Sequence, residues 1–116
     1  MILRNLSHPE VLLTRYRAHG GGVAHMLLTH PRLATLMFLA HASIPPGQRL
    51  EGHIDPMEEI YIILKGRGMM RVDAEERPVG PGDAVHLPIG AWHELVNDGD
   101  ETLEIHVVAG LIPGEA

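Results

Sequence analysis

The stretch from Gly52 to Gly66, GHIDPMEEIYIILKG, places one histidine and three carboxylates beside a run of aliphatic residues. Side chains two positions apart in an extended strand share a face, so His53 and Asp55 are expected to point the same way. A bend at Pro56-Met57 followed by a second strand can turn Glu59 toward them. The stretch therefore predicts a hairpin that gathers one imidazole and two carboxylates, on strands that are adjacent.

The composition limits the classes of protein that the chain can belong to. A length of 116 residues with 45% hydrophobic residues suits one domain with its own core, residues 1–116, rather than a disordered tail. The absence of cysteine excludes disulfides and thiolate metal ligands, so a metal must be held by imidazole and carboxylate groups. The net charge of -6 and the lack of a basic run argue against a nucleic-acid partner.

The N-terminus, MILRNLSHPE, has no long apolar core, and no stretch of the sequence is long and apolar enough to cross a membrane. We therefore expect a cytoplasmic protein without a membrane partner.

Glycine and proline interrupt the sequence at short intervals, and the segments between them are rich in Val, Ile and Leu, which is typical of short strands. The strands expected are 23–29, 33–44, 49–54, 58–64, 68–73, 84–87, 92–96 and 102–108. Residues 9–17 fit either a short amphipathic helix or an edge strand. The sequence predicts an all-β domain of eight or nine strands, a closed barrel or a jelly roll.

A fourth polar group follows in GPGDAVHLPIGAWHELVN, residues 80–97, where Pro88 to Ala91 form a turn and His93 begins the next strand. The spacing alone does not establish that His93 meets the first three polar groups.

The two stretches together resemble the paired motifs of the cupin superfamily. The first motif reads G-x5-H-x-H-x3/4-E-x6-G and the second G-x5-P-x-G-x2-H-x3-N, and nine of the ten positions agree. The matching residues are Gly47, His53, Glu59, Gly66, Gly82, Pro88, Gly90, His93 and Asn97. The exception is Asp55, which stands in the place of the second histidine. The resemblance covers residues 44–108 well, and residues 1–22 are left as an N-terminal extension or edge strand.

The resemblance implies a small single-domain cupin of the conserved-barrel type, a double-stranded β-helix or jelly roll with one divalent metal ion, Mn, Fe, Ni or Zn. Carried over by position, the ligands are His53, Glu59 and His93, with Asp55 as the fourth candidate. Asp55 has three possible roles: it binds the metal, it hydrogen-bonds a ligand or a metal-bound water, or the site has decayed and it pairs with Arg49 or Arg71.

Six further polar residues lie near the motifs or on candidate strands. Glu58 is expected to face away from Glu59, and His106 to face outward because Leu103, Ile105 and Val107 form the better inward set. For His25, His41 and His86 a structural role is favoured over a place in the pocket, and Tyr61 is expected to share the face of Glu59.

The function expected is a metal-dependent enzyme acting on a small oxygen-rich molecule, of dioxygenase, isomerase or lyase type. The alternative is a non-catalytic module that binds a small ligand or a metal, and a metal-free structural homologue is a third possibility. Cupins of this size commonly pair, so the resemblance also implies a homodimer.

Overall fold

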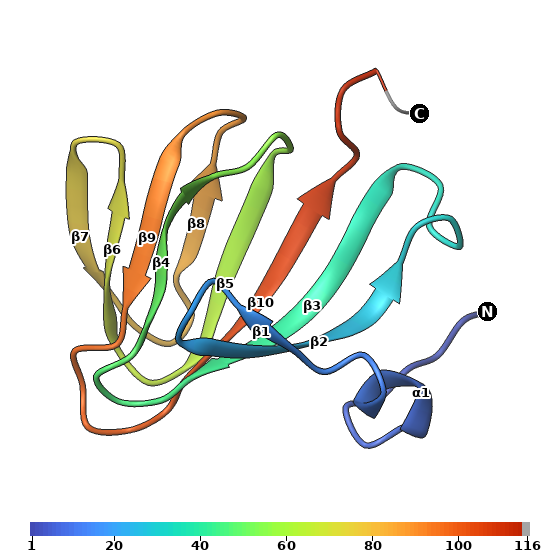
Figure 1. Ribbon diagram of the computed structural model, residues 1–116, viewed down its shortest axis with the longest axis horizontal. Helices are drawn as coiled ribbons and strands as arrows, with labels where there is room; N and C mark the ends of the chain where they lie inside the picture. Colours follow the sequence, from blue (N-terminus) through green and yellow to red (C-terminus); the bar gives the residue numbers. More distant parts are fainter. Residues whose placement is uncertain (115–116) are drawn as a thin grey trace.

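The computed structural model describes residues 1–114 as one short helix, α1 (Pro9–Leu12), and ten strands (Figure 1). The strands are β1 (Tyr16–Ala18), β2 (Gly22–Thr29), β3 (Leu36–Ile44), β4 (Arg49–Ile54), β5 (Glu59–Lys65), β6 (Gly68–Val72), β7 (Glu75–Val79), β8 (Ala84–Leu87), β9 (Trp92–Val96) and β10 (Leu103–Gly110). No helix of this part of the chain is long and apolar enough to span a membrane.

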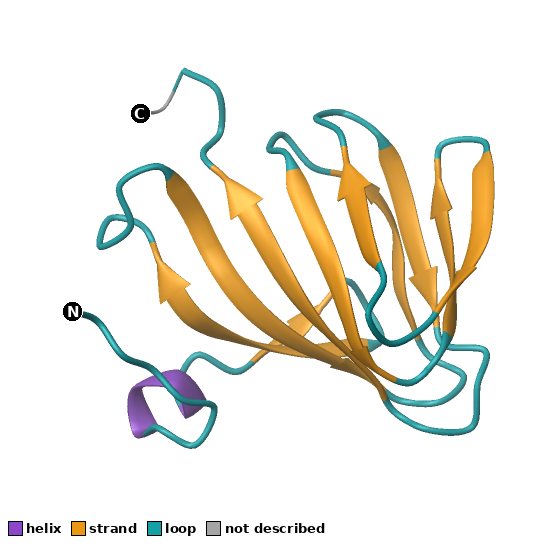
Figure 2. Ribbon diagram, turned by 180° about the vertical axis from the view of Figure 1, so that it is seen from behind, coloured by secondary structure: helices purple, strands orange, loops and turns teal. Residues whose placement is uncertain are grey.

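The strands form two antiparallel sheets that face each other as a jelly roll (Figures 1 and 2). The six-stranded sheet has the order β1-β2-β3-β10-β5-β8, and the four-stranded sheet has the order β4-β9-β6-β7. The edges of the two sheets meet at β1 and β4, where Gly20 and Leu50 form an isolated bridge. At the opposite side β7 and β8 are both edge strands, so the sheets do not close into a barrel there.

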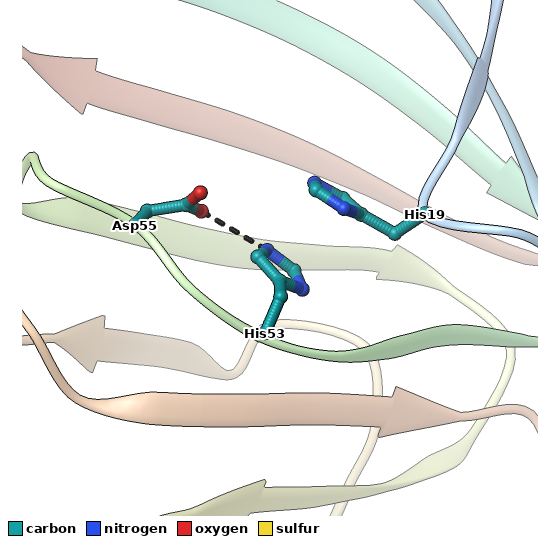
Figure 3. Close-up of side chains that lie close together, drawn as sticks. All are labelled: His19, His53 and Asp55. Atoms are coloured by element: carbon teal, nitrogen blue, oxygen red, sulfur yellow. Dashed lines mark hydrogen bonds and ion pairs between the residues drawn. The ribbon is translucent and has the colours of Figure 1, made fainter.

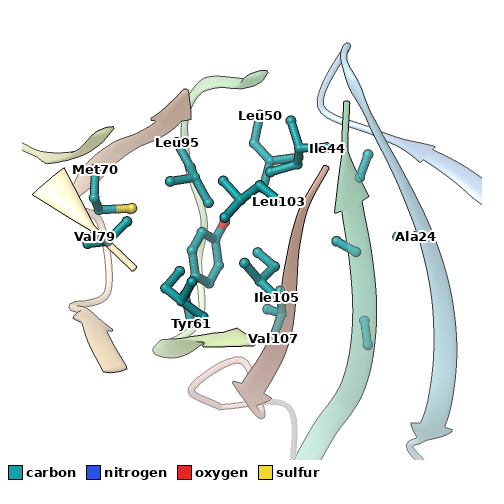
Figure 4. Packing of buried hydrophobic residues seen from close by; sticks show 14 of the residues in the cluster. Ala24, Ile44, Leu50, Tyr61, Met70, Val79, Leu95, Leu103, Ile105 and Val107 are labelled. Atoms are coloured by element: carbon teal, nitrogen blue, oxygen red, sulfur yellow. The ribbon is translucent and has the colours of Figure 1, made fainter. Parts of the chain in front are cut away.

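The core lies between the sheets, and the alternation of side chains along β10 shows how it is built. Leu103, Ile105 and Val107 are buried against the core, whereas Glu104 and His106 between them are half-buried on the outer face. Figure 4 shows the inward side chains of the six-stranded sheet, to which β10 belongs, facing Met70 and Leu95 of the four-stranded sheet. Aliphatic side chains thus fill the core, as a chain so poor in aromatic residues requires.

Asn97, the last position of the second motif, has a structural role. Its side chain is fully buried, and its Nδ2 donates to the carbonyl oxygens of Ile44 and Glu101, each at 2.8 Å. Its Oδ1 accepts from the backbone N–H of Gly99 at 3.0 Å. These bonds attach the turn between β9 and β10, at Gly99 and Glu101, to Ile44 at the end of β3.

The expected all-β fold is confirmed, with corrections at three segments. Strand β7 was not predicted, because four of the five residues of EERPV are exposed and Pro78 lies among them, so an edge strand has no apolar pattern to find. For residues 9–17 the predicted helix and the predicted edge strand are each partly right, because the short helix α1 is followed by the edge strand β1. The strand expected at 33–44 begins only at Leu36.

Candidate metal centre

The four candidate ligands come from three strands and one loop, and they meet between the two sheets. His53 in β4 lies directly opposite His93 in β9, while Glu59 begins β5 of the other sheet. Asp55 lies just after β4, in the segment that crosses from one sheet to the other. The hairpin predicted for this stretch is therefore wrong: β4 and β5 are not paired, and their polar residues face each other across the core.

Short distances join the polar atoms of these residues. Asp55 Oδ2 lies 3.0 Å from His53 Nε2 and 3.5 Å from His93 Nε2. Glu59 Oε1 lies 3.7 Å from the same nitrogen of His93. Asp55, Glu59 and His93 each offer one ligand atom within 4.8 Å of the others, which is close enough for a single ion to lie among them.

Backbone carbonyls fix the orientation of both imidazoles. His53 Nδ1 lies 2.7 Å from the carbonyl oxygen of Glu51, and His93 Nδ1 lies 3.1 Å from that of Ala91. A carbonyl oxygen only accepts, so in each ring Nδ1 carries a proton and Nε2 of the neutral ring presents a lone pair to the centre. The lone pair of His53 Nε2 then faces a carboxylate oxygen, and a proton or a metal ion has to lie between them.

Burial leaves two of these atoms without a partner. The residues Glu59 and His93 are 5% and 2% exposed, and within residues 1–114 neither Glu59 Oε1 nor His93 Nε2 has a hydrogen-bond partner. Buried polar atoms are almost always hydrogen-bonded, so a facing oxygen and nitrogen both left unpaired need an explanation. A cation between them would satisfy both, and the donor set of two imidazoles and two carboxylates suits a divalent transition metal.

The two carboxyl groups titrate far apart. Burial, followed by the neighbouring Asp55, raises the pKa of Glu59 to about 9. The hydrogen bond with His53 first, and then the nearby imidazole of His93, hold the pKa of Asp55 well below its usual range. Two carboxylates so close together cannot both ionise easily without a cation, because each disfavours the charge of the other.

The imidazole of His53 and the phenol of Tyr61 also have shifted pKa values. Burial lowers the pKa of His53, but the bonds to Asp55 and to the Glu51 carbonyl outweigh it, and the pKa is raised overall. Tyr61 is 2% exposed, and burial followed by the charge of Glu59 raises its pKa well above the usual value. Tyr61 shares the inner face with Glu59, as expected, and its ring lies edge-on to His93.

The third possible role of Asp55, pairing with a guanidinium group, is wrong. Arg49 Nη1 lies 3.4 Å from Glu94 Oε2, and Arg71 Nη2 lies 2.6 Å from Glu76 Oε2. Both arginines are thus paired with other carboxylates, and the basic side chains that contact Asp55 are those of His53 and His93.

The structure also brings His19 into this site, a residue that the sequence reading missed. Its imidazole stacks on that of His53, with 3.5 Å between ring centroids and 13° between planes (Figure 3). The ligand atoms of His19, His53 and Asp55 lie within 4.8 Å of one another. The signal available in the sequence is a histidine directly before the triple glycine Gly20–Gly22, which the reading treated only as a turn.

The remaining histidines of the strands lie outside the site, as expected. His25, His41 and His106 are cross-strand neighbours in β2, β3 and β10, on the outer face of the six-stranded sheet. His41 Nε2 lies 3.1 Å from Glu104 Oε1. His86 and Glu58 are exposed and pair with each other, which agrees with the surface role expected for Glu58.

A small cavity of about 40 Å³ adjoins the centre between the sheets. Glu59, Tyr61 and His19 are among its polar lining, and the alanines Ala24, Ala40 and Ala42 form much of its apolar wall. A larger cavity of about 800 Å³ opens between β7 and β8, and none of the four candidate ligands lines it.

Comparisons with known proteins place the chain in a family. The family model described as "Cupin domain" matches residues 40–109, and the chain belongs to this family. The chain is 36% identical over 94 residues to an uncharacterized protein of Methanocaldococcus jannaschii, covering 78% of this chain and 74% of the relative. It is 32% identical over 66 residues to a gentisate 1,2-dioxygenase of Ralstonia sp, covering 56% of this chain and only 19% of the enzyme.

The fold has close counterparts among solved structures. The crystal structure of a predicted oxalate decarboxylase from Thermotoga maritima superposes with a TM-score of 0.80 at 26% sequence identity, covering 95% of this chain and 99% of that one.

Proposed function

We propose that the chain binds one divalent metal ion through His53, Asp55, Glu59 and His93. The observation that carries this proposal is a pair of buried atoms, Glu59 Oε1 and His93 Nε2, which face each other beside the ionised Asp55 and have no hydrogen-bond partner among the residues that the structure describes. Leaving such groups buried and unpaired costs about 1–3 kcal/mol each, more where a charge is involved, and a bound cation removes that cost. Two imidazoles with two carboxylates suit Mn or Fe, with Ni and Zn as the other candidates.

The function that this centre supports best is a metal-dependent enzyme acting on a small oxygen-rich molecule, of dioxygenase, isomerase or lyase type. A divalent ion held there supplies Lewis acidity to the oxygen atoms of a bound molecule. The similarity to a gentisate 1,2-dioxygenase supports the dioxygenase type, over the part of that enzyme that the chain matches.

The residues around the ion have separate tasks in this proposal. The carbonyls of Glu51 and Ala91 keep the protons of His53 and His93 on Nδ1, so that both Nε2 atoms stay free for coordination. The Tyr61 phenol is protonated at neutral pH already at its ordinary pKa of 10.0, and its raised pKa extends this to higher pH, so its hydroxyl can donate to an oxygen of the substrate. The alanine wall of the cavity excludes water from one side of the centre.

Turnover tests this proposal. Wild-type protein loaded with Mn, Fe, Ni or Zn is incubated with small hydroxy- and oxo-carboxylic compounds, gentisate included. Products are followed by NMR and oxygen consumption by electrode. Conversion should disappear on chelation and in Glu59→Gln, and should persist in Glu104→Gln, which changes a carboxylate on the outer face.

The size of the cavity favours a second candidate, a non-catalytic module that binds a metal or a small ligand. Binding sites for drug-sized molecules usually enclose about 300–1,000 Å³, whereas the cavity at the centre measures about 40 Å³. A compound that raises the Tm of the metal-loaded protein but is recovered unchanged would favour this candidate over the enzyme.

We also propose that residues 1–116 form one domain and that the protein forms a homodimer. The outer face of β5 presents Ile60 and Leu64, 41% and 42% exposed, with Ile62 between them. An apolar row of this kind on one sheet face is suited to pairing with a second copy.

A further inference from the structure

The turn that joins β1 to β2, residues 18–22, runs along β4 and is called the strap below. Its backbone is hydrogen-bonded to that strand at two points. The Gly21 N–H donates to the carbonyl oxygen of Arg49 at 3.0 Å, and the Glu51 N–H donates to the carbonyl oxygen of His19 at 2.8 Å. The strap is thereby attached to β4, the strand that carries His53. The bond at Glu51 lies only two residues before His53.

Glycine is required for this close approach. A Cβ atom at Gly21 would lie 2.6 Å from the carbonyl oxygen of Arg49, and one at Gly22 would lie 2.6 Å from Leu50 Cδ2. A backbone oxygen of a paired strand cannot move aside as the end of a side chain can. His19 itself has a φ of 45°, which is uncommon for a residue with a side chain. The strap thus holds His19 in a conformation that packing must stabilise.

The position of His19 places its ring flat on one face of the His53 ring (Figure 3). His93 lies edge-on to the His53 ring, at 4.2 Å between centroids and 64° between planes. The Glu51 carbonyl holds Nδ1 of His53, and Nε2 points to Asp55. His53 is therefore held at both nitrogens, with one neighbour stacked on its ring and another against it.

The parallel planes decide which part of His19 acts. The lone pair of an imidazole nitrogen lies in the plane of its ring, so two rings 13° from parallel direct their lone pairs side by side and not at one point. In this arrangement His19 and His53 do not converge on a single ion. It is the face of the His19 ring, rather than a nitrogen, that lies against His53.

We propose that His19 is a positioning residue of the metal centre, which holds the His53 ring in the orientation for coordination and covers it from solvent. This inference rests on the proposed metal binding. It makes the strap part of the site, where the sequence reading placed residues 1–22 in an extension or edge strand.

The affinity for Co²⁺ tests this proposal, measured by titration of its visible absorption under competition with a chelator of known affinity. His19→Ala removes the stacked ring and should raise the Kd for Co²⁺ about tenfold or more, as losses of groups that orient metal ligands do. His19→Phe retains a flat ring without a nitrogen and should keep the Kd within about threefold of the wild type, well short of that loss. His86→Ala, which removes an exposed imidazole outside the site, should leave the Kd unchanged.

A second pair of variants moves the strap without changing any imidazole. Gly21→Ala places a methyl group against the Arg49 carbonyl and should weaken Co²⁺ binding as His19→Ala does. Gly99→Ala is the matched control, because its Cβ would meet neighbours only at 3.5 Å, an ordinary contact. NMR of the metal-free proteins should show the His53 ring protons shifted upfield by the stacked ring in the wild type and in His19→Phe, and not in His19→Ala.

The outcomes separate this inference from the proposed function. Tight Co²⁺ binding that is unaffected by His19→Ala overturns the inference alone. An equal loss of affinity in His19→Phe and His19→Ala also overturns it, because His19 would then act through its nitrogen as a ligand. A wild-type protein that binds no Co²⁺ overturns the proposed metal binding, and the inference with it.

Discussion

Glu59 and Asp55 show how position decides the charge of two carboxyl groups that the sequence places four residues apart. Asp55 faces two imidazoles and is held ionised, while Glu59 begins β5 and is buried beside His93 and Asp55. The pKa values of the two groups move in opposite directions for that reason. In the metal-free protein Glu59 is then protonated at neutral pH.

Replacing Glu59 should therefore change the pH dependence of stability. Between its ordinary pKa of 4.5 and the raised value of about 9, the folded metal-free protein keeps a proton on Glu59 that the unfolded chain releases. Stability must then fall as pH rises through this window. Because Glu59→Gln cannot titrate, its Tm should exceed that of the wild type by an amount that grows from pH 5 to pH 9, by several degrees for each ~1 kcal/mol.

The measurement is thermal unfolding in chelator at a series of pH values, with the exposed Glu101→Gln as control. A difference in Tm between Glu59→Gln and the wild type that stays constant from pH 5 to pH 9 would contradict the assignment.

At the scale of single elements, β4 illustrates what the sequence could and could not predict. The period-two spacing of His53 and Asp55 and the motif spacing to Glu59 and His93 were enough to select the residues that the structure brings together. Whether β4 and β5 pair could not be predicted from spacing. A short loop can either return the chain beside the strand it has just left or carry it to the opposite sheet. His19 could not be found from spacing at all, since its place depends on the contact of the strap with β4.

Strand β4 also contains a glycine that is needed for packing. A Cβ atom at Gly52 would overlap the indole ring of Trp92, which lies across this position. Gly52→Ala should push the indole outward and lower the free energy of unfolding by about 1–3 kcal/mol, as overpacking does. Trp92 is the only tryptophan, so a red shift of the intrinsic fluorescence reports the movement directly.

Gly99→Ala serves as the control for this substitution, since its Cβ has room. Wild-type fluorescence and stability in Gly52→Ala would show that the indole does not depend on Gly52.

For the whole molecule, the paired motifs predicted the jelly roll and its family, and the scarcity of aromatic residues accounts for the aliphatic core. What composition could not predict is the use of the outer sheet face, because strand periodicity separates inward from outward residues but does not say what covers the outward ones. The row of Ile60, Ile62 and Leu64 on β5 is the clearest case.

The proposed homodimer gives a prediction at this scale. Sedimentation velocity in the micromolar range should give twice the mass of one chain. Ile60→Asp should dissociate the dimer, because it places a charge in the apolar row. Ile89→Asp, at an exposed turn residue outside that row, should not. A wild-type monomer at these concentrations would contradict the proposal.

The most direct test of the metal centre is elemental analysis of untagged protein purified without chelator, beside His93→Ala and Asp55→Ala. We predict about one divalent ion per chain in the wild type, lost in His93→Ala and lost or strongly reduced in Asp55→Ala. Full retention in Asp55→Ala would show that Asp55 hydrogen-bonds at the centre without coordinating the ion. No metal in the wild type, even after incubation with Mn, Fe, Ni and Zn, would contradict metal binding at this site.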